Sequence, residues 1–160
     1  MTDSYNAEQI VAQLRQNNLT VATAESLTAG MLSSAIADVS GASTVLHGGI
    51  IAYNNAIKHR LLGVSADTLA ARGAVDAETA KQMARGARER LNADLGIATT
   101  GVAGPDPSEG KAVGIVFIAL ATAEETSAKL LRFGGNREKI RRSTVAASLK
   151  LMAEWLERYG

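Results

Sequence analysis

Short apolar segments alternate along the whole chain with segments whose apolar residues recur at helical spacing. The longest apolar segment, residues 113–122, is nearly continuous, which is typical of a strand buried on both faces. Strands that alternate with helices favour a single sheet covered by helices on both sides. The sequence therefore predicts the α/β class, as a three-layer α/β/α sandwich with a mixed, mostly parallel sheet.

Five strands are expected, at residues 20–24, 48–53, 95–100, 113–122 and 127–133. A short connection joins the last two, so these should be antiparallel. Helices are expected at residues 7–17, 30–39, 54–62, 66–72, 77–91 and from 136 onward. Asn6 with Gln9 resembles a capping box, and Asp76 should cap a later helix. We find no repeat or linker, so residues 1–160 should form a single domain.

Composition excludes several classes of function. Hydrophobic residues make up 46% and charged residues 21% of the chain, and the formal net charge is only +1. We therefore expect no nucleic-acid partner and no basic membrane-binding surface. The chain contains no cysteine, so disulfides, thiol catalysis and cysteine-bound metals are excluded. Residues 1–5 lack the features of a signal peptide and no apolar run is long enough to cross a membrane, which favours a cytoplasmic location.

Two polar turns that contain glycine follow expected strands. One is Glu25-Ser26-Leu27-Thr28-Ala29-Gly30, and the other is Thr99-Thr100-Gly101-Val102-Ala103-Gly104-Pro105-Asp106. Ligands of open α/β sheets bind beyond the carboxyl ends of the strands, and glycine lets the backbone approach a ligand closely. Each turn is therefore a candidate binding element, although each could equally be a tight connection.

The residues of common hydrolase sites are scarce. His47 and His59 are the only histidines, and no ligand spacing accompanies them that would indicate zinc. A Ser-His-Asp triad remains possible by composition, but a surface or core position is the more common place for a lone histidine.

A serine and a lysine offer another arrangement. Ser43 lies in a helix-breaking turn before the second strand, Tyr53 ends that strand, and Lys58 follows in the next element. A buried lysine can act as a general base, and Ser–Lys pairs are known to activate a hydroxyl. The alternative is that Ser43 caps a turn, that Tyr53 lies at the sheet edge and that Lys58 is a solvated charge.

Six segments of the chain form an ordered set of motifs: Ala24 to Gly30, Tyr53 to Lys58, Gly73 to Val75, Thr100 to Pro105, Lys111 to Gly114, and Gly135 to Arg137 with Arg141. In this order they resemble the CinA C-terminal domain, the family of nicotinamide-nucleotide amidohydrolases. The first is similar to A-E-S-C-T-G-G and the fourth to T-G-[IV]-A-G-P. Because the segments span nearly the whole chain, the resemblance is specific.

The resemblance implies an amidase that needs no metal and no cofactor and that converts nicotinamide mononucleotide to nicotinic acid mononucleotide and ammonia. By the family pattern Ser43 is the nucleophile, Lys58 is the base and Tyr53 assists. The residues expected to bind the substrate come from the two turns and the last helix: Glu25, Ser26, Thr28, Gly30, Thr100, Gly101, Gly104, and Arg137 or Arg141 for the phosphate.

The chain departs from the family pattern at four positions. Leu27 replaces a cysteine, Ala29 replaces the first glycine of a pair, Asn54 replaces serine or threonine, and Ala112 replaces proline. Of these, Ala29 could narrow a turn that contacts the ligand. A non-catalytic nucleotide-binding or protein-interaction module is the alternative function. A homodimer is the expected assembly.

Overall fold

Five strands form the central layer of the molecule in the order β2-β1-β3-β4-β5. Their bounds are Val21–Glu25 for β1, Leu46–Ile51 for β2, Leu95–Gly101 for β3, Ile115–Ala121 for β4 and Thr126–Arg132 for β5. The pairs β1–β2 and β1–β3 are parallel, and the pairs β3–β4 and β4–β5 are antiparallel. The mixed sheet is thus as predicted, and only β4 runs against the other four strands.

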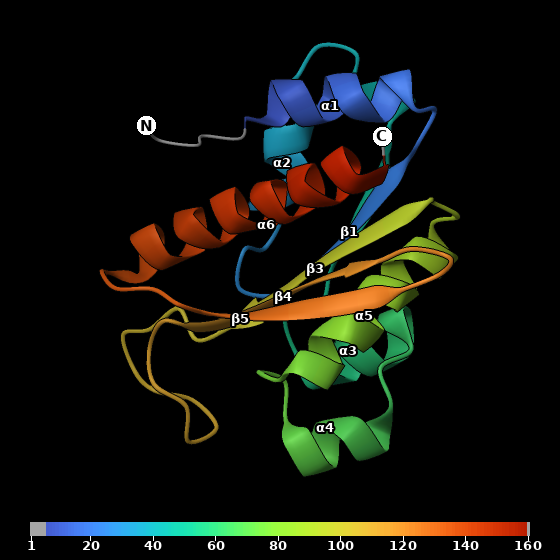
Figure 1. Cartoon of the computed structure of the whole chain (residues 1–160). Helices are drawn as coiled ribbons and strands as arrows, with labels where there is room; N and C mark the ends of the chain where they lie inside the picture. The colour runs from blue at the N-terminus through green and yellow to red at the C-terminus, as the bar shows by residue number, and fades with distance from the viewer. Residues whose placement is uncertain (1–5, 160) are drawn as a thin grey trace.

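Helices cover both faces of this sheet in the computed structural model, which describes residues 6–159 (Figure 1). The segment Met1–Tyr5, which we examined for a signal peptide, lies outside the described residues. One face carries α1 (Ala7–Gln16), α2 (Met31–Ala37) and α6 (Arg137–Tyr159). The other carries α3 (Asn55–Leu62), α4 (Ala66–Arg72) and α5 (Ala77–Arg90). The prediction of three layers is confirmed.

The strands supply two separate cores because alternate residues point to opposite faces. In β1, Val21 packs under α1, α2 and α6, whereas Ala22 and Ala24 face α3 and α5. The second face is built of small residues, and α5 approaches the sheet closely there. A β-carbon at Gly96 of β3 would collide with the carbonyl of Ala84 in α5. This close packing fixes the helices on the α5 face with little freedom.

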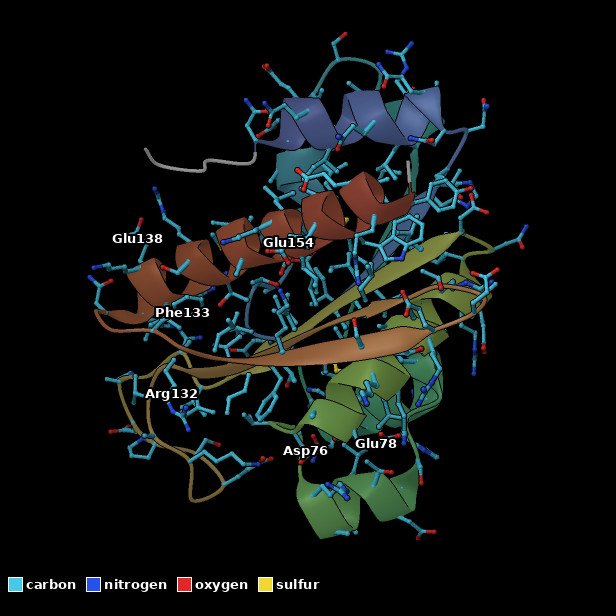
Figure 2. The ribbon with its side chains drawn as sticks, viewed as in Figure 1. Asp76, Glu78, Arg132, Phe133, Glu138 and Glu154 are labelled. Carbon is cyan, nitrogen blue, oxygen red and sulfur yellow. The ribbon has the colours of Figure 1, made fainter. Side chains whose placement is uncertain are left out.

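The helix starts follow the capping chemistry of the sequence. Asn6 Oδ1 accepts a hydrogen bond from Gln9 N at 2.9 Å, as predicted for the first helix. Asp76 caps α5 by accepting from Glu78 N at 2.8 Å, and Figure 2 shows both side chains where α5 begins, next to α4. Asn54 caps α3 in the same way, through Ile57 N at 2.9 Å. At position 54 asparagine therefore keeps the capping ability of the serine or threonine it replaces.

One end of the sheet gathers the connections that matter for function. The carboxyl ends of β1, β2 and β3 lie together because these strands are parallel. The loop of residues 102–114 and the start of α6 lie at this same end, on the left in Figure 1. Within residues 6–159, no helix has both the length and the apolar character that crossing a membrane would need.

Candidate active site

Lys58 is buried at the carboxyl ends of β1 and β2, with only 1% of its surface exposed. The lysine belongs to α3, whose start is fixed by Asn54 and whose end is fixed by Gly63 in the left-handed conformation. Side chains on a helix point toward its N-terminus. Lys58 Nζ therefore reaches back to the strand end and donates to Ala52 O at 2.9 Å and to Tyr53 O at 3.4 Å.

The third partner of Lys58 Nζ is Ser26 Oγ, at 3.1 Å. Ser26 is the first residue after β1, and its N–H donates to Thr99 O of β3 at 3.0 Å. The register pairs Glu25 with Ile51 of β2, so the residues that follow each strand, Ser26 and Ala52, lie side by side. Parallel pairing of β1 and β2 thus brings the serine next to the lysine.

Burial lowers the pKa of the Lys58 amine from 10.5 to about 8, because the ammonium form loses its water. The carboxylate of Glu109 acts in the opposite direction and raises the same pKa. The net result is a lysine that loses its proton much more readily than a solvated one, which is the property that a general base needs.

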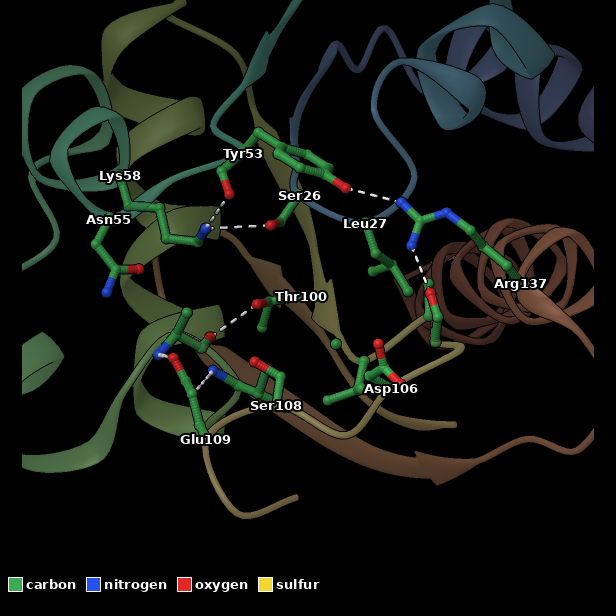
Figure 3. Close-up of a pocket in the computed structure, with 16 residues that line it drawn as sticks. Ser26, Leu27, Tyr53, Asn55, Lys58, Thr100, Asp106, Ser108, Glu109 and Arg137 are labelled. Carbon is green, nitrogen blue, oxygen red and sulfur yellow. Dashed lines mark hydrogen bonds between the residues drawn. The ribbon is translucent and has the colours of Figure 1, made fainter. Parts of the chain in front are cut away.

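Ser26 and Lys58 lie at a cavity of about 310 Å³, a size at the lower end of small-molecule sites. Figure 3 shows Ser26, Tyr53, Lys58, Thr100 and Glu109 arranged around it, with Arg137 on the other side. The other lining residues come from three connections, the start of α3 and the end of β3: Leu27, Asn55, Ala74, Val75, Gly101, Val102, Ala103, Gly104, Asp106 and Ser108. The strand ends, the start of α3 and the loop of residues 102–114 therefore share one site.

Ser43 does not take part in this site. It lies exposed in a short 3₁₀ turn, Ala42–Thr44, before β2, whereas Lys58 comes after the other end of β2. A strand of this length spans about 20 Å. The predicted pairing of Ser43 with Lys58 is therefore not formed, and the serine that Lys58 contacts is Ser26. The sequence had placed Ser26 among the binding residues only.

Tyr53 and Arg137 meet at the mouth of the cavity. The Tyr53 side chain is 57% exposed, and its hydroxyl accepts a hydrogen bond from Arg137 Nη2 at 2.8 Å. Arg137 Nη1 donates to Gly104 O at 2.7 Å. The arginine is the first residue of α6 and ties the loop of residues 102–114 to the tyrosine. Of the two arginines expected near a phosphate, Arg137 lines the cavity.

The second glycine turn lies beside the cavity as expected. Thr100, Gly101 and Gly104 all line it. The Thr100 hydroxyl donates to Ala74 O at 2.7 Å. Gly101 is required for a packing reason, because a β-carbon there would press against Val116 of β4. Gly104 has a φ of +87°, a left-handed conformation that favours glycine.

The first turn is held in place by residues that do not line the cavity. The buried Glu25 carboxylate accepts from Leu32 N at 2.8 Å and from Ser33 N at 3.1 Å at the start of α2. Thr28 Oγ1 bonds to Thr99 Oγ1 at 2.7 Å. Arg141 of α6 donates to the carbonyls of the turn, from Nε to Leu27 O at 2.8 Å and from Nη2 to Thr28 O at 3.2 Å.

These contacts change the interpretation of several expected binding residues. Glu25, Thr28 and Arg141 orient the turn that carries Ser26, and Gly30 begins α2 with a φ of +101°. None of the four is among the residues that line the cavity. Ala29, where the family pattern has glycine, adopts a φ of +46°. The backbone of the turn is therefore the one that glycine prefers, although the side chain present is a methyl group.

The two histidines lie outside the cavity. His59 Nδ1 bonds to Val64 O at 2.7 Å, and His47 Nδ1 bonds to Leu91 O at 2.9 Å. Each ring is thus engaged with a backbone carbonyl of a neighbouring connection. Among the described residues, no three His, Asp or Glu side chains gather as a metal site would require.

Glu109 is a cavity residue that the sequence analysis did not identify. Its carboxylate accepts from Ala74 N at 3.0 Å and from Val75 N at 3.1 Å. Nothing in the sequence pattern singles out a glutamate in a polar loop. The two residues whose amides bond to Glu109 could be found from the sequence, because Gly73-Ala74-Val75 is one of the segments that resemble the family.

The fold and the site define a three-layer α/β protein with a buried serine–lysine pair at the carboxyl ends of parallel strands. The sequence matches the CinA C-terminal domain over residues 3–156. The chain therefore belongs to the CinA family, as its motifs predicted. A relative from Desulforamulus reducens, named as a competence-damage inducible protein, is 47% identical over 156 residues. That match covers 97% of this chain but 38% of the relative, so the chain spans about two fifths of that protein's length.

Solved structures agree with this assignment over nearly their whole length. The competence/damage inducible protein CihA from Agrobacterium tumefaciens is 36% identical, with a TM-score of 0.90 and coverage of 94% of this chain and 93% of that one. A CinA superfamily protein from Klebsiella pneumoniae is 27% identical, with a TM-score of 0.93 and coverage of 95% and 96%. The names of these proteins state no reaction.

Proposed function

We propose that this chain is an amidohydrolase that converts nicotinamide mononucleotide to nicotinic acid mononucleotide and ammonia. The observation that carries the proposal is the hydrogen bond between the buried Lys58 amine and the Ser26 hydroxyl at the cavity. The choice of substrate rests on the resemblance of the motifs to nicotinamide-nucleotide amidohydrolases. The nucleophile in this proposal is Ser26, since Ser43 lies beyond the other end of β2.

The oxygens around Lys58 Nζ are placed so that the neutral amine can direct its lone pair at the serine. A neutral amine has two hydrogens, and Ala52 O and Tyr53 O lie where they can accept both. The lone pair is then left for the Ser26 hydroxyl, which donates its proton to Nζ. Since the pKa of Lys58 is lowered to about 8 by burial, this state is accessible near neutral pH.

Acylation then needs one proton to move twice. The Ser26 hydroxyl proton passes to Lys58 Nζ as Oγ attacks the carboxamide carbon. The ammonium of Lys58 returns a proton to the amide nitrogen as the C–N bond breaks, and ammonia leaves. The product of this half-reaction is an ester between the nicotinoyl group and Ser26.

Hydrolysis of the ester repeats the sequence with water. Lys58 takes a proton from water as the hydroxide attacks the ester carbon, and the Ser26 oxygen leaves and regains the proton from Nζ. The product leaves as the carboxylic acid and gives up its own proton to the solvent to become the carboxylate, so the serine and the lysine both end in their starting states.

The oxyanion formed in each step needs hydrogen-bond donors. The residue after a nucleophile in a strand-to-helix turn often supplies one of them. Here that residue is Leu27, which lines the cavity and whose N–H has no acceptor among the described residues. The Leu27 N–H is therefore our candidate donor, and the bond from Arg141 to Leu27 O ties down the turn to which it belongs.

The remote end of the substrate would lie toward Arg137. The guanidinium of this residue is at the cavity mouth, where it already donates to Tyr53 Oη and Gly104 O. A phosphate offers stronger acceptors than a phenol or a carbonyl, so the mononucleotide would take over one of these donors. Binding of the substrate would then rearrange the contact between Arg137 and Tyr53.

Release of ammonia from nicotinamide mononucleotide tests the proposal directly. The unmodified protein should release one ammonia for each nicotinic acid mononucleotide formed. Ser26→Ala should lose nearly all of this activity, whereas Ser43→Ala, a matched change of an exposed serine, should keep it. Binding of the nucleotide without ammonia release would contradict the proposal and favour the nucleotide-binding module.

A further inference from the structure

One carboxylate that lines the cavity has no part in the steps described so far. Glu109 lies in the loop of residues 102–114, with a φ of +54°, which is uncommon for a residue with a side chain. Its two oxygens accept from the consecutive amides of Ala74 and Val75. A strained backbone and a two-point attachment together indicate that this carboxylate is held at a defined place.

The segment to which Glu109 attaches is itself fixed to the site. Ala74 O accepts from the hydroxyl of Thr100, the residue of β3 that lines the cavity. Val75 O accepts from Lys111 Nζ of the same loop as Glu109. The loop, the segment and the strand end therefore form one connected wall. Figure 3 shows Glu109 on this wall and Lys58 on the same side of the cavity.

In the proposed reaction the negative charge of Glu109 can stabilise positive charge that develops in the cavity. Lys58 becomes an ammonium in each half-reaction, at a site where 99% of its surface is removed from solvent. The substrate's pyridinium ring would bring a second positive charge into the same cavity. Burial disfavours both charges, so a nearby carboxylate lowers the free energy of the state in which both are present.

We propose that Glu109 is a positioning residue that acts through Lys58, stabilising its protonated amine from the same side of the cavity during acyl transfer. The catalytic part of this statement rests on the amidohydrolase proposal, whereas the interaction between the two side chains does not. The effect of Glu109 in raising the pKa of Lys58 supports it, since burial alone would lower that pKa further. The carboxylate thus sets how strong a base the lysine is.

Other polar and charged groups lie near Lys58 and Glu109, and the effect of Glu109 on the pKa of Lys58 must be separated from theirs. Tyr53, Asp106 and Arg137 line the same cavity, and His59 and Lys111 lie next to Lys58 and to the Glu109 segment. Asp106 is the useful comparison, because it is the second carboxylate that lines the cavity, whereas Glu109 is the one that raises the pKa of Lys58.

The test is a titration of Lys58 in the free protein, followed by NMR of ¹³C-labelled lysine and assigned with Lys58→Met. The unmodified protein should show a midpoint at about pH 8. Glu109→Gln, which keeps the size of the side chain and removes its charge, should move the midpoint to lower pH. Asp106→Asn should leave it in place. An unmoved midpoint in Glu109→Gln, or an equal shift in both variants, would overturn the inference.

The same variants then separate positioning from a purely structural role. In Glu109→Gln the rise of kcat/KM with pH should begin at lower pH, because the base loses its proton more readily, and the plateau should fall. A lower plateau with an unmoved rise would mean that Glu109 only holds the loop. Glu109→Asp keeps the charge and should shift the midpoint less than Glu109→Gln. If the chain releases no ammonia at all, the NMR titration still decides the electrostatic part.

Discussion

Lys58 Nζ and Ser26 Oγ lie 3.1 Å apart, although 32 residues separate them in the sequence. The contact follows from the parallel pairing of β1 and β2, which sets the residues after both strands side by side. The residue after β1 supplies the hydroxyl of Ser26, and α3, the helix that follows β2, supplies the amine of Lys58. Because the amine and the hydroxyl are hydrogen-bonded to each other, the two side chains should act as one unit.

We expect Ser26→Ala and Lys58→Arg each to abolish nearly all amidase turnover. Arginine stays protonated in proteins and cannot act as a base, and alanine has no hydroxyl. The double variant should lose no more than either single variant, because each change removes the same step. Ammonia release at saturating nucleotide measures this. If the fold-loss of turnover in the double variant equals the two single fold-losses multiplied together, the two residues act independently and the shared mechanism is contradicted.

The buried amine of Lys58 should make the protein less stable below its own pKa. The folded-state pKa is about 8 and the ordinary value is 10.5. At pH 7 Lys58 is mostly protonated in both the folded and the unfolded protein, and burial of its ammonium lowers the free energy of unfolding by about 3 kcal/mol. As pH rises from about 8 to 10.5 the unfolded state holds more protons than the folded one, so the free energy of unfolding should increase.

Lys58→Met removes the titrating group and keeps an unbranched side chain of similar length. We expect this variant to be more stable than the unmodified protein at pH 7, and the difference should shrink toward pH 10. Urea unfolding at several pH values measures both. A constant difference across this range would show that Lys58 is not forced toward its neutral form by burial.

The comparison between sequence and structure is most instructive at the two serines. Alternating segments and caps predicted the layers, because those signals are local and repeat along the chain. The contact of Lys58 with Ser26 depends on which strands are neighbours, and periodicity does not encode the order β2-β1-β3. The carboxyl-end rule would have found it, since Ser26 follows a strand and Ser43 precedes one.

Arg141 and Glu109 illustrate two further limits of the sequence. The motif of the last helix suggested two arginines without distinguishing them, and only the position of the turn shows that Arg141 bonds to Leu27 O and Thr28 O. Glu109 is one of several charged residues in a polar loop, and its contact with Ala74 N joins segments 35 residues apart. Such long-range polar contacts leave no periodic signal.

Replacing Gly86 should displace the catalytic helix. Gly86 lies within α5, where alanine would ordinarily favour the helix. A β-carbon at this position would collide with the Leu62 carbonyl of α3, the helix that carries Lys58. We expect Gly86→Ala to lower the free energy of unfolding by about 1–3 kcal/mol and to reduce turnover. Gly134→Ala is the control, because nothing lies within 4 Å of its added carbon. Equal effects of the two changes would contradict this account of the packing.

Arg137 should distinguish the mononucleotide from its riboside. If the guanidinium binds the phosphate, nicotinamide riboside should be the poorer substrate of the unmodified protein. Arg137→Ala should then reduce kcat/KM for the mononucleotide by roughly tenfold or more, the loss of one charge-assisted hydrogen bond, and change riboside turnover little. Arg141→Ala should instead lower turnover of both, since Arg141 holds the turn that carries Ser26. Equal use of both substrates would remove Arg137 from this role.

Ala29 should be a site where a single change increases stability. Its φ of +46° lies in the left-handed region, which costs a residue with a β-carbon about 1 kcal/mol relative to glycine. We therefore expect Ala29→Gly to raise the free energy of unfolding by at most about that amount, measured by urea unfolding. Glycine also gives the unfolded chain more conformational freedom, which lowers the free energy of unfolding. The control for this opposing effect is Ala70→Gly on the exposed surface of α4. Because Ala29 does not line the cavity that contains Ser26 and Lys58, its methyl group should not restrict the substrate, and turnover should stay unchanged. A less stable Ala29→Gly variant would mean that the turn tolerates the methyl group without strain.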